Sequence, residues 1–203
     1  MNKLQADIKK EIFSWAMTHN LQIIINFHNE QRRLMKNQVS EINEKLKSCN
    51  DRHERTELLN KKEIYINTFD SLLRTNTFLM MYSHLEEFLY HVWKSFDKNQ
   101  AVRKSGSLKR FEGVVSNILN VDLGHDREWN LLMDYEKVRD CLLHANGRVS
   151  ISRDKKYLEE LIKNPRVHLS MKIDRIIISG YFLDSVSKTI ERLIKRVEKA
   201  ANA

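Results

Sequence analysis

The sequence predicts a mainly α-helical protein, and three observations lead to this prediction. Only one proline and five glycines occur in 203 residues, so few residues would interrupt long helices. Charged residues make up 31% of the chain and apolar residues 41%, a balance typical of amphipathic helices. Apolar residues also recur at intervals of three and four along most of the chain, which is the period of a helix with one buried face.

The first third of the chain predicts two long antiparallel helices. Apolar residues follow a helical period from Leu4 to Leu34, with an interruption at Thr18-His19-Asn20 that allows a break there. Between residues 30 and 62 charged and amide side chains dominate, and Ser48-Cys49-Asn50-Asp51 is the best candidate for a turn. We therefore expect residues 1–66 to form a helical hairpin, packed on or extending from a bundle made by residues 67–203.

The segments that follow are expected to supply the core of the bundle. Apolar side chains between residues 64 and 96 are dense enough for a helix that is buried on more than one side. Residues 98–109 are polar and basic around Gly106, which predicts a surface loop. A short helix is expected over residues 108–119, and it ends within residues 122–126.

A further helix is expected to begin near His125 or Asp126 and to end at Asn146-Gly147. Glu128 in its first turn suits the positive end of the helix dipole, and an Asn-Gly pair suits a left-handed cap. A four-three-four-three spacing places one stripe toward the core: Leu131, Tyr135, Val138, Leu142 and Ala145. At about 100° per residue, a second semi-apolar side remains on this helix. It is made by Leu132, Met133 and Leu143.

The remaining C-terminal residues predict a mixture of short elements and one long helix. Residues 148–152 have an extended pattern, and residues 155–163 a short helix that Asn164-Pro165 would stop. Residues 167–179 alternate partly with a period of two, which fits either a short hairpin or an extended connection. Residues 181–200 are expected to form an amphipathic helix.

Charge and cysteine content limit the class of protein. The net charge of +8 and the isoelectric point near 9.4 favour polyanionic partners such as RNA, because Lys and Arg displace counterions from phosphates. Cys49 and Cys141 lie far apart and form no CxxC pair, so neither a disulfide framework nor a thiolate zinc site is indicated. No apolar run approaches membrane-spanning length, and we expect a soluble, cytoplasmic protein with no membrane partner.

The chemistry is expected near the end of the helix that stops at Asn146-Gly147. Asp140 and His144 lie one turn apart on its outward side, and Arg139 lies at the boundary with the core stripe. From the residues alone, two interpretations stay open. The Asp-His pair is either part of a site or an ordinary weak surface contact, and the arginine either binds an anion or extends its head into water.

The motif Val138-Arg139-Asp140-Cys141-Leu142-Leu143-His144-Ala145-Asn146-Gly147 resembles the signature of the HEPN superfamily. In these small helical domains of toxins, anti-phage systems and RNA-processing proteins, an Arg and a polar residue precede a His, and Asn and Gly often follow at the helix end. The flanking segments MYSHLEEFLYHVW and IIISGYFLDSV agree, so the resemblance covers residues 69–197. It implies a HEPN-like helical bundle.

The resemblance also implies an activity, a partner and residue roles. It implies a metal-independent endoribonuclease, without a cofactor, whose site forms where two motif helices meet across a two-fold axis. The Leu132/Met133/Leu143 side would then contact its symmetry mate. His144 would transfer the 2′-hydroxyl or leaving-group proton, Arg139 would stabilise charge on phosphorus, and Asp140 would orient or charge the imidazole.

Further predictions concern substrate binding, partners and an alternative function. Asn146 could hydrogen-bond a phosphate or only cap the helix, and a basic loop could follow an RNA backbone or merely be solvated. This loop comprises Arg103, Lys104, Lys109 and Arg110. A toxin or anti-phage effector is expected, with an antitoxin or defence-system partner protein. The Tyr that some HEPN toxins carry two positions after the motif His is Asn146 here, so modification by a nucleotidyltransferase antitoxin is not supported. The alternative function is a non-catalytic module that binds RNA, a nucleotide or a protein.

A second cluster of polar residues is a weaker candidate for a site. His84, Glu87 and His91 share one side of the expected core helix at a spacing that could supply metal ligands. No further His or Cys cluster completes a coordination shell, so we expect no metal and assign these residues to buried polar contacts, with Glu87 or His91 near the active cleft.

Overall fold

The computed structural model describes the backbone of residues 3–96 and 107–201, and the side chains of residues 16–95 and 107–200. Helices form most of the described chain, and within these ranges the only sheet is a two-stranded antiparallel hairpin. The predicted mainly α fold, with a long helix at the N-terminus, is thus confirmed.

The N-terminal hairpin consists of one very long helix and a shorter one that returns beside it. Helix α1 (Lys3–Ser48) has 46 residues and α2 (Arg52–Glu63) has 12, and the turn predicted at residues 48–51 is confirmed. The Asp51 carboxylate accepts a hydrogen bond from the backbone N–H of Glu54 and so caps α2. The break that the sequence allowed at residues 18–20 does not occur, because Met17 and Leu21 on either side of it are buried in the core and hold α1 continuous.

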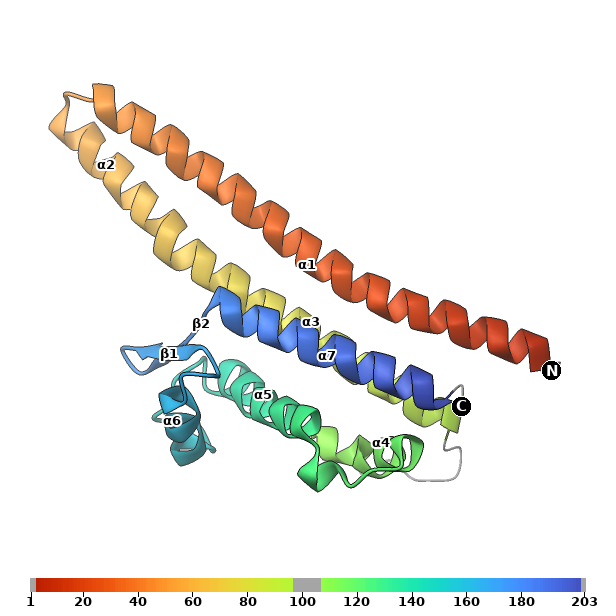
Figure 1. The fold of residues 1–203 in the computed structure, drawn as a ribbon. Coiled ribbons are helices and arrows are strands. Elements are labelled where there is room, and N and C mark those ends of the chain that lie inside the picture. Colours follow the sequence, from red (N-terminus) through yellow and green to blue (C-terminus); the bar gives the residue numbers. More distant parts are fainter. Residues whose placement is uncertain (1–2, 97–106, 202–203) are drawn as a thin grey trace.

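A π-helix joins the hairpin to the bundle. It covers Ile64–Phe69 and leads without interruption from α2 into α3 (Asp70–Phe96), so one helical run lies antiparallel to α1 (Figure 1). The domain boundary expected between residues 66 and 67 falls inside this run, and that division stays a prediction. The N-terminal part of α1 packs along α3, whereas the hairpin tip extends away from the bundle (Figure 1).

The bundle is built around α3 and α7 (Gly180–Ala201), which lie between α1 on one side and the shorter elements on the other (Figure 1). The shorter elements include α4 (Glu112–Leu119) and α5 (Arg127–His144). The rings of Phe78, Tyr135 and Phe182 join three helices, with centroids 5.2 Å apart for Phe78–Phe182 and 5.3 Å apart for Tyr135–Phe182. The apolar face predicted for the final helix is buried.

Short elements complete the fold beside α5. They are two 3-10 turns (Leu108–Phe111 and Leu123–His125), α6 (Lys155–Lys163) and the strands β1 (Leu169–Lys172) and β2 (Arg175–Ile178). Of the two possibilities for residues 167–179, the hairpin is therefore correct. Residues 148–152, expected to be extended, form turns instead, with one bridge from Arg148 to Arg175.

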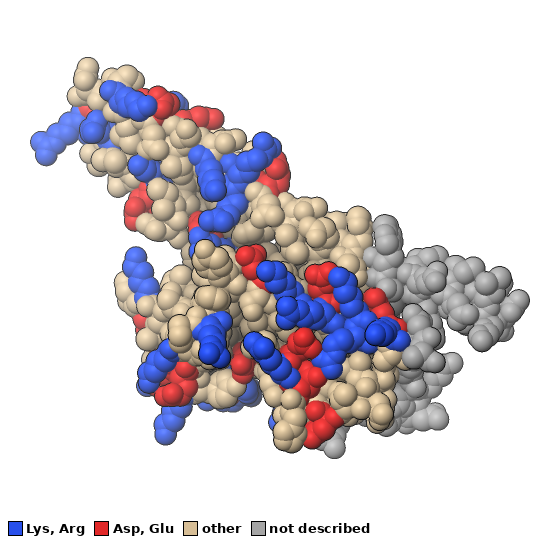
Figure 2. All heavy atoms as spheres, viewed as in Figure 1, with Lys and Arg blue, Asp and Glu red and all other residues tan. Residues whose placement is uncertain are grey.

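The described surface is charged and mixed. On the face shown in Figure 2, Lys and Arg side chains occur on both the hairpin and the bundle, with Asp and Glu between them and uncharged residues around them. Among the described residues no helix has the length and apolar character needed to cross a membrane.

Candidate active site

Contacts at both ends of helix α5 fix the position of its last turn relative to the bundle. At its start, Asp126 accepts a hydrogen bond from the Trp129 N–H and forms an ion pair of 2.6 Å with Arg196 of α7. At its end, Asn146 and Gly147 have φ values of 51° and 74°, and the Gly147 N–H donates to the Cys141 carbonyl at 3.0 Å. This is the left-handed termination predicted from the Asn-Gly pair.

The buried side of α5 is wider than the sequence pattern predicted. Tyr135, Val138 and Ala145 are buried as expected, and Leu131 and Leu142 are partly buried against the core. Leu132, however, is fully buried, so its assignment to an outward dimer face is wrong. The reason is that α3, α6 and α7 all pack on α5, which covers more than one side of it. Of the same set, Met133 packs partly against the core and Leu143 is 49% exposed.

Two cavities bring the three motif residues together. Arg139, Asp140 and His144 line a cavity of about 270 Å³. Asp140 and His144 also line a second cavity of about 300 Å³, between the end of α5 and residues 151–154. Arg153 borders both cavities, so a cation reaches this site from outside α5.

Arg139 is held by carboxylates on two helices. One terminal nitrogen, Nη1, donates to Asp140 Oδ1 at 2.9 Å, and Nη2 lies 3.4 Å from Glu86 Oε2 on α3. The guanidinium also lies over the ring of Tyr82, 5.6 Å from its centroid. Desolvation by burial would lower the pKa of Arg139, but the hydrogen bond that Arg139 donates to Asp140 and the charge of Glu86 outweigh it and raise this pKa. A permanently charged, positioned guanidinium therefore borders the cavity, with its side chain 22% exposed.

Asp140 contacts arginines rather than the histidine. Besides Arg139, it forms an ion pair of 3.6 Å with Arg153. Within the described residues no hydrogen bond joins Asp140 to His144, although both line the same cavities. The expectation that Asp140 orients the imidazole directly is therefore not met in a single chain, and its observed contacts position Arg139. His144 is exposed at the cavity edge.

Glu86 is a site residue that the sequence reasoning missed. Its two carboxylate oxygens face Arg139 at 3.4 Å and Arg110 at 3.9 Å. Burial raises the pKa of this carboxyl group, against the lowering effect of the two arginines. A signal was present in the sequence, because Glu86 follows Tyr82 by four residues and precedes Leu89 by three, which places a carboxylate on an apolar face of α3.

Glu136 is a second missed residue, and it ties another segment to the cavity. Its buried carboxylate accepts hydrogen bonds from Ser107 Oγ at 2.9 Å and from the Leu108 N–H at 2.8 Å. Nearby, Lys137 pairs with Asp154 at 3.1 Å. Sequence periodicity alone does not distinguish such buried charges in a helix from solvent-facing ones.

The residues expected to bind substrate have different outcomes. Arg110 is engaged by Glu86, and its guanidinium lies 4.6 Å from the Phe111 ring centroid, whereas Lys109 is exposed. Arg103 and Lys104 lie outside the described residues. Asn146 is exposed beyond the helix end, and its carbonyl accepts a hydrogen bond of 2.7 Å from Arg175.

The remaining candidates have structural contacts. His84 is buried, with Nε2 2.7 Å from the Met17 carbonyl, and His91 lies 4.0 Å from Glu87. Among the described residues no group of three or more His, Cys, Asp or Glu is placed to hold a metal ion. Burial raises the pKa of the Cys141 thiol, which disfavours a thiolate nucleophile beside the motif.

In comparisons with family models, curated proteins and solved structures, the chain matched none. The functional argument therefore depends on the motif and on the geometry around it.

Proposed function

We propose that the chain is a metal-independent endoribonuclease of the HEPN type, which cleaves RNA by attack of the 2′-hydroxyl on the adjacent phosphorus. One observation carries this proposal: Arg139 and His144 line the same cavity, together with Asp140. An anion-binding group and a proton-transfer group beside one open space are the minimum equipment for this reaction.

The chemistry assigns a role to each side chain. The imidazole of His144 takes the proton of the 2′-hydroxyl as the 2′-oxygen forms a bond to phosphorus, or gives a proton to the 5′-oxygen as its bond to phosphorus breaks. Arg139 stabilises the negative charge that accumulates on the phosphoryl oxygens. Asp140 and Glu86 hold the guanidinium in position before substrate binds. The products are a 2′,3′-cyclic phosphate and a 5′-hydroxyl.

Two proton transfers favour a site shared by two copies of the chain. One histidine borders the cavity of each chain, whereas the reaction uses an acid and a base at the same time. A two-fold contact between the ends of two α5 helices would supply the second imidazole. Leu143 is 49% exposed and stays in the proposed homodimer contact, and Ile151, which is 65% exposed, takes the place of the buried Leu132.

The resemblance further supports a cytoplasmic toxin or anti-phage effector that acts with a defence-system partner. The net charge of +8 supports RNA as substrate, because phosphate contacts dominate nucleic-acid affinity.

A non-catalytic RNA-, nucleotide- or protein-binding module is the second candidate, and one observation favours it. Arg139 already has two carboxylate partners, Glu86 and Asp140, which would suit a purely structural role. In that case substitution of Arg139 would lower stability, and substitution of His144 would have no effect on any RNA.

The test is cleavage of RNA in EDTA by the full chain and by two histidine variants. We expect His144→Ala to lose at least about a hundredfold in rate, the usual contribution of one acid-base group. His125→Ala is the matched control, because His125 lies just before the start of α5 and its side chain is 91% exposed and outside the two cavities. Equal rates for wild type and both variants would contradict the proposal.

A further inference from the structure

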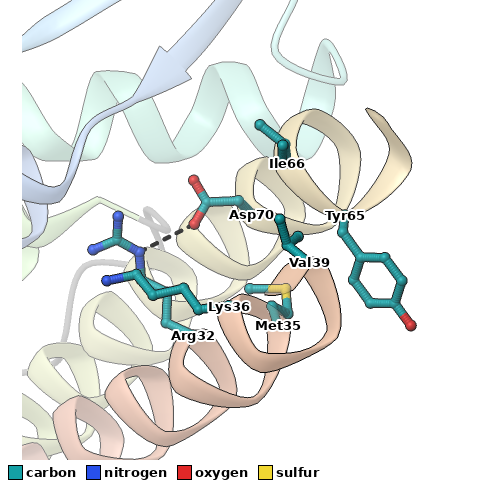
Figure 3. A pocket seen from close by; sticks show the side chains of 7 residues that line it. All are labelled: Arg32, Met35, Lys36, Val39, Tyr65, Ile66 and Asp70. Carbon is teal, nitrogen blue, oxygen red and sulfur yellow. Dashed lines mark hydrogen bonds and ion pairs between the residues drawn. The ribbon is translucent and has the colours of Figure 1, made fainter. Parts of the chain in front are cut away.

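A separate cavity lies between α1 and the π-helix, far along the chain from the motif residues. It has a volume of about 200 Å³ and shares no lining residue with the cavities of the active site. One wall comes from α1 and the other from the π-helix and the first residue of α3 (Figure 3). A π-helix is a rare element that is frequently found at functional sites, so this cavity is a reasonable place to look for a ligand.

One end of the cavity carries an excess of positive charge. Arg32 and Lys36 are separated by one turn of α1 and extend toward the same end of the cavity (Figure 3). Two like charges at this spacing are unfavourable without a counter-charge. Asp70 is the only acidic residue that lines the cavity in the part of the chain described.

Asp70 cannot neutralise both of these cations, because its carboxylate is also bound by Arg74. Its Oδ1 lies 3.2 Å from Arg32 Nε, and its Oδ2 accepts a hydrogen bond from Arg74. Arg32 contacts Asp70 through Nε, and within the described residues its two terminal nitrogens and the ammonium of Lys36 have no hydrogen-bond partner. The local charges therefore leave donors available for an anion, and a tetrahedral phosphate suits both donor types.

The other end of the cavity is apolar and contains an aromatic ring. Met35 and Val39 come from α1, and Tyr65 and Ile66 from the π-helix. The Tyr65 ring lies at the end opposite the two cations in Figure 3, and it is perpendicular to the Phe69 ring, with 5.3 Å between centroids. A cationic end and an apolar end within one small space match a ligand with an anionic group and a ring.

We propose that this cavity binds a phosphate monoester that carries a ring, with the phosphate on Arg32 and Lys36 and the ring on the apolar wall. A nucleoside monophosphate and the side chain of phosphotyrosine both present this chemistry. The inference uses no residue of the active site and does not depend on the proposed nuclease function.

The test is a calorimetric titration of the full chain with phenyl phosphate, inorganic phosphate and phenol. We expect saturable binding of phenyl phosphate, tighter than that of inorganic phosphate, and no saturation with phenol. Lys36→Gln should weaken phenyl phosphate binding about tenfold, since a charge-assisted hydrogen bond is lost. Lys45→Gln is the matched control, because Lys45 is an exposed lysine further along α1 that lies outside the cavity.

Two results would overturn the proposal: absence of saturation by phenyl phosphate, or equal dissociation constants for Lys36→Gln and Lys45→Gln. Titration with AMP and with phosphotyrosine then distinguishes a nucleotide ligand from a phosphotyrosine ligand. Whichever of the two is the natural ligand should bind more tightly than phenyl phosphate. Weaker binding of both than of inorganic phosphate would also overturn it. We also expect His144→Ala to bind phenyl phosphate as wild type does, so that this test and the test of the nuclease proposal can fail independently.

Discussion

At the scale of single residues, Arg139 belongs to a chain of alternating charges. Arg110, Glu86, Arg139, Asp140 and Arg153 follow one another as ion-pair partners. Each carboxylate lies between two guanidinium groups, so Arg139 is positioned from two sides. Such positioning lowers the reorganisation needed when a phosphate develops extra charge.

The buried histidine of α1 gives a residue-scale prediction about pH. His28 is buried, and its Nδ1 lies 2.8 Å from Thr77 Oγ1. Desolvation by burial, with the charge of Arg32, lowers the pKa of His28 below its usual value of 6.5. The unfolded chain therefore binds more protons at this residue once the pH falls below that value, and the free energy of unfolding decreases.

We expect wild type to lose stability between about pH 7.5 and about pH 5.5, and His28→Gln to lose less of it. Urea unfolding at both pH values measures this loss. His53→Gln is the control, because the His53 side chain is 87% exposed and should leave the loss as in wild type. An identical loss in His28→Gln and wild type would mean that burial of His28 does not couple folding to pH.

At the scale of elements, the β-hairpin holds the residues that follow the motif. The Val149 N–H donates to the Asp174 carbonyl at 2.9 Å, and the Ser150 N–H donates to Asp174 Oδ1 at 2.8 Å. The Ile176 N–H also donates to the Gly147 carbonyl at 2.9 Å. The cavity wall made by residues 151–154 thus begins from a segment anchored to the hairpin turn.

The hairpin turn contains an unfavourable residue. Ile173 and Asp174 have φ values of 48° and 63°, as in a type I′ turn, where Asn or Gly is preferred. A β-branched residue is strained at positive φ, and Ile173 is 88% exposed, so it gains nothing from burial in this chain.

We expect Ile173→Asn to stabilise the protein by about 1 kcal/mol, because Asn tolerates the left-handed conformation. Thermal or urea unfolding measures the change. Ile173→Val keeps the branched Cβ and should give no gain. A loss of stability in Ile173→Asn would show that the isoleucine side chain has a contact that outweighs the backbone strain.

Local signals explain which elements the sequence predicts well. The turn at residues 48–51, the end of α5 at Asn146-Gly147 and the end of α6 at Asn164 all depend on residues within one turn of the boundary. The continuity of α1 through residues 18–20 and the burial of Leu132 depend instead on which helices lie alongside. The π-helix likewise has no sequence pattern that periodicity could detect.

At the scale of the whole molecule, some residues of the site are brought together by local spacing and others by tertiary packing. Arg139, Asp140 and His144 share one turn and a half of α5, so helical spacing alone brings them together. Ser107 and Arg153 line the cavity from two other parts of the chain, and Glu86 contacts Arg139 from a third. Their presence there follows from tertiary packing and could not be derived from spacing.

A shared site also predicts an oligomeric state. We expect a mass in solution of twice the 24.2 kDa of one chain, and we expect Leu143→Asp to give monomers without ribonuclease activity, since an apolar two-fold contact does not tolerate two facing carboxylates. Light scattering coupled to size exclusion measures the mass. Leu59→Asp is the control, because Leu59 is 48% exposed on the hairpin and outside the proposed contact. A monomeric wild type with full activity would contradict the shared site.

The central claim is that RNA is cleaved by its own 2′-hydroxyl at the Arg139–His144 site. Its most direct test is the cleavage of two oligonucleotides of one sequence, with ribose or 2′-deoxyribose at every position, by the wild-type chain in EDTA. The account predicts cleavage of the ribose form to 2′,3′-cyclic phosphate and 5′-hydroxyl ends, and no cleavage of the deoxyribose form. Equal cleavage of both, or cleavage of neither, would contradict it.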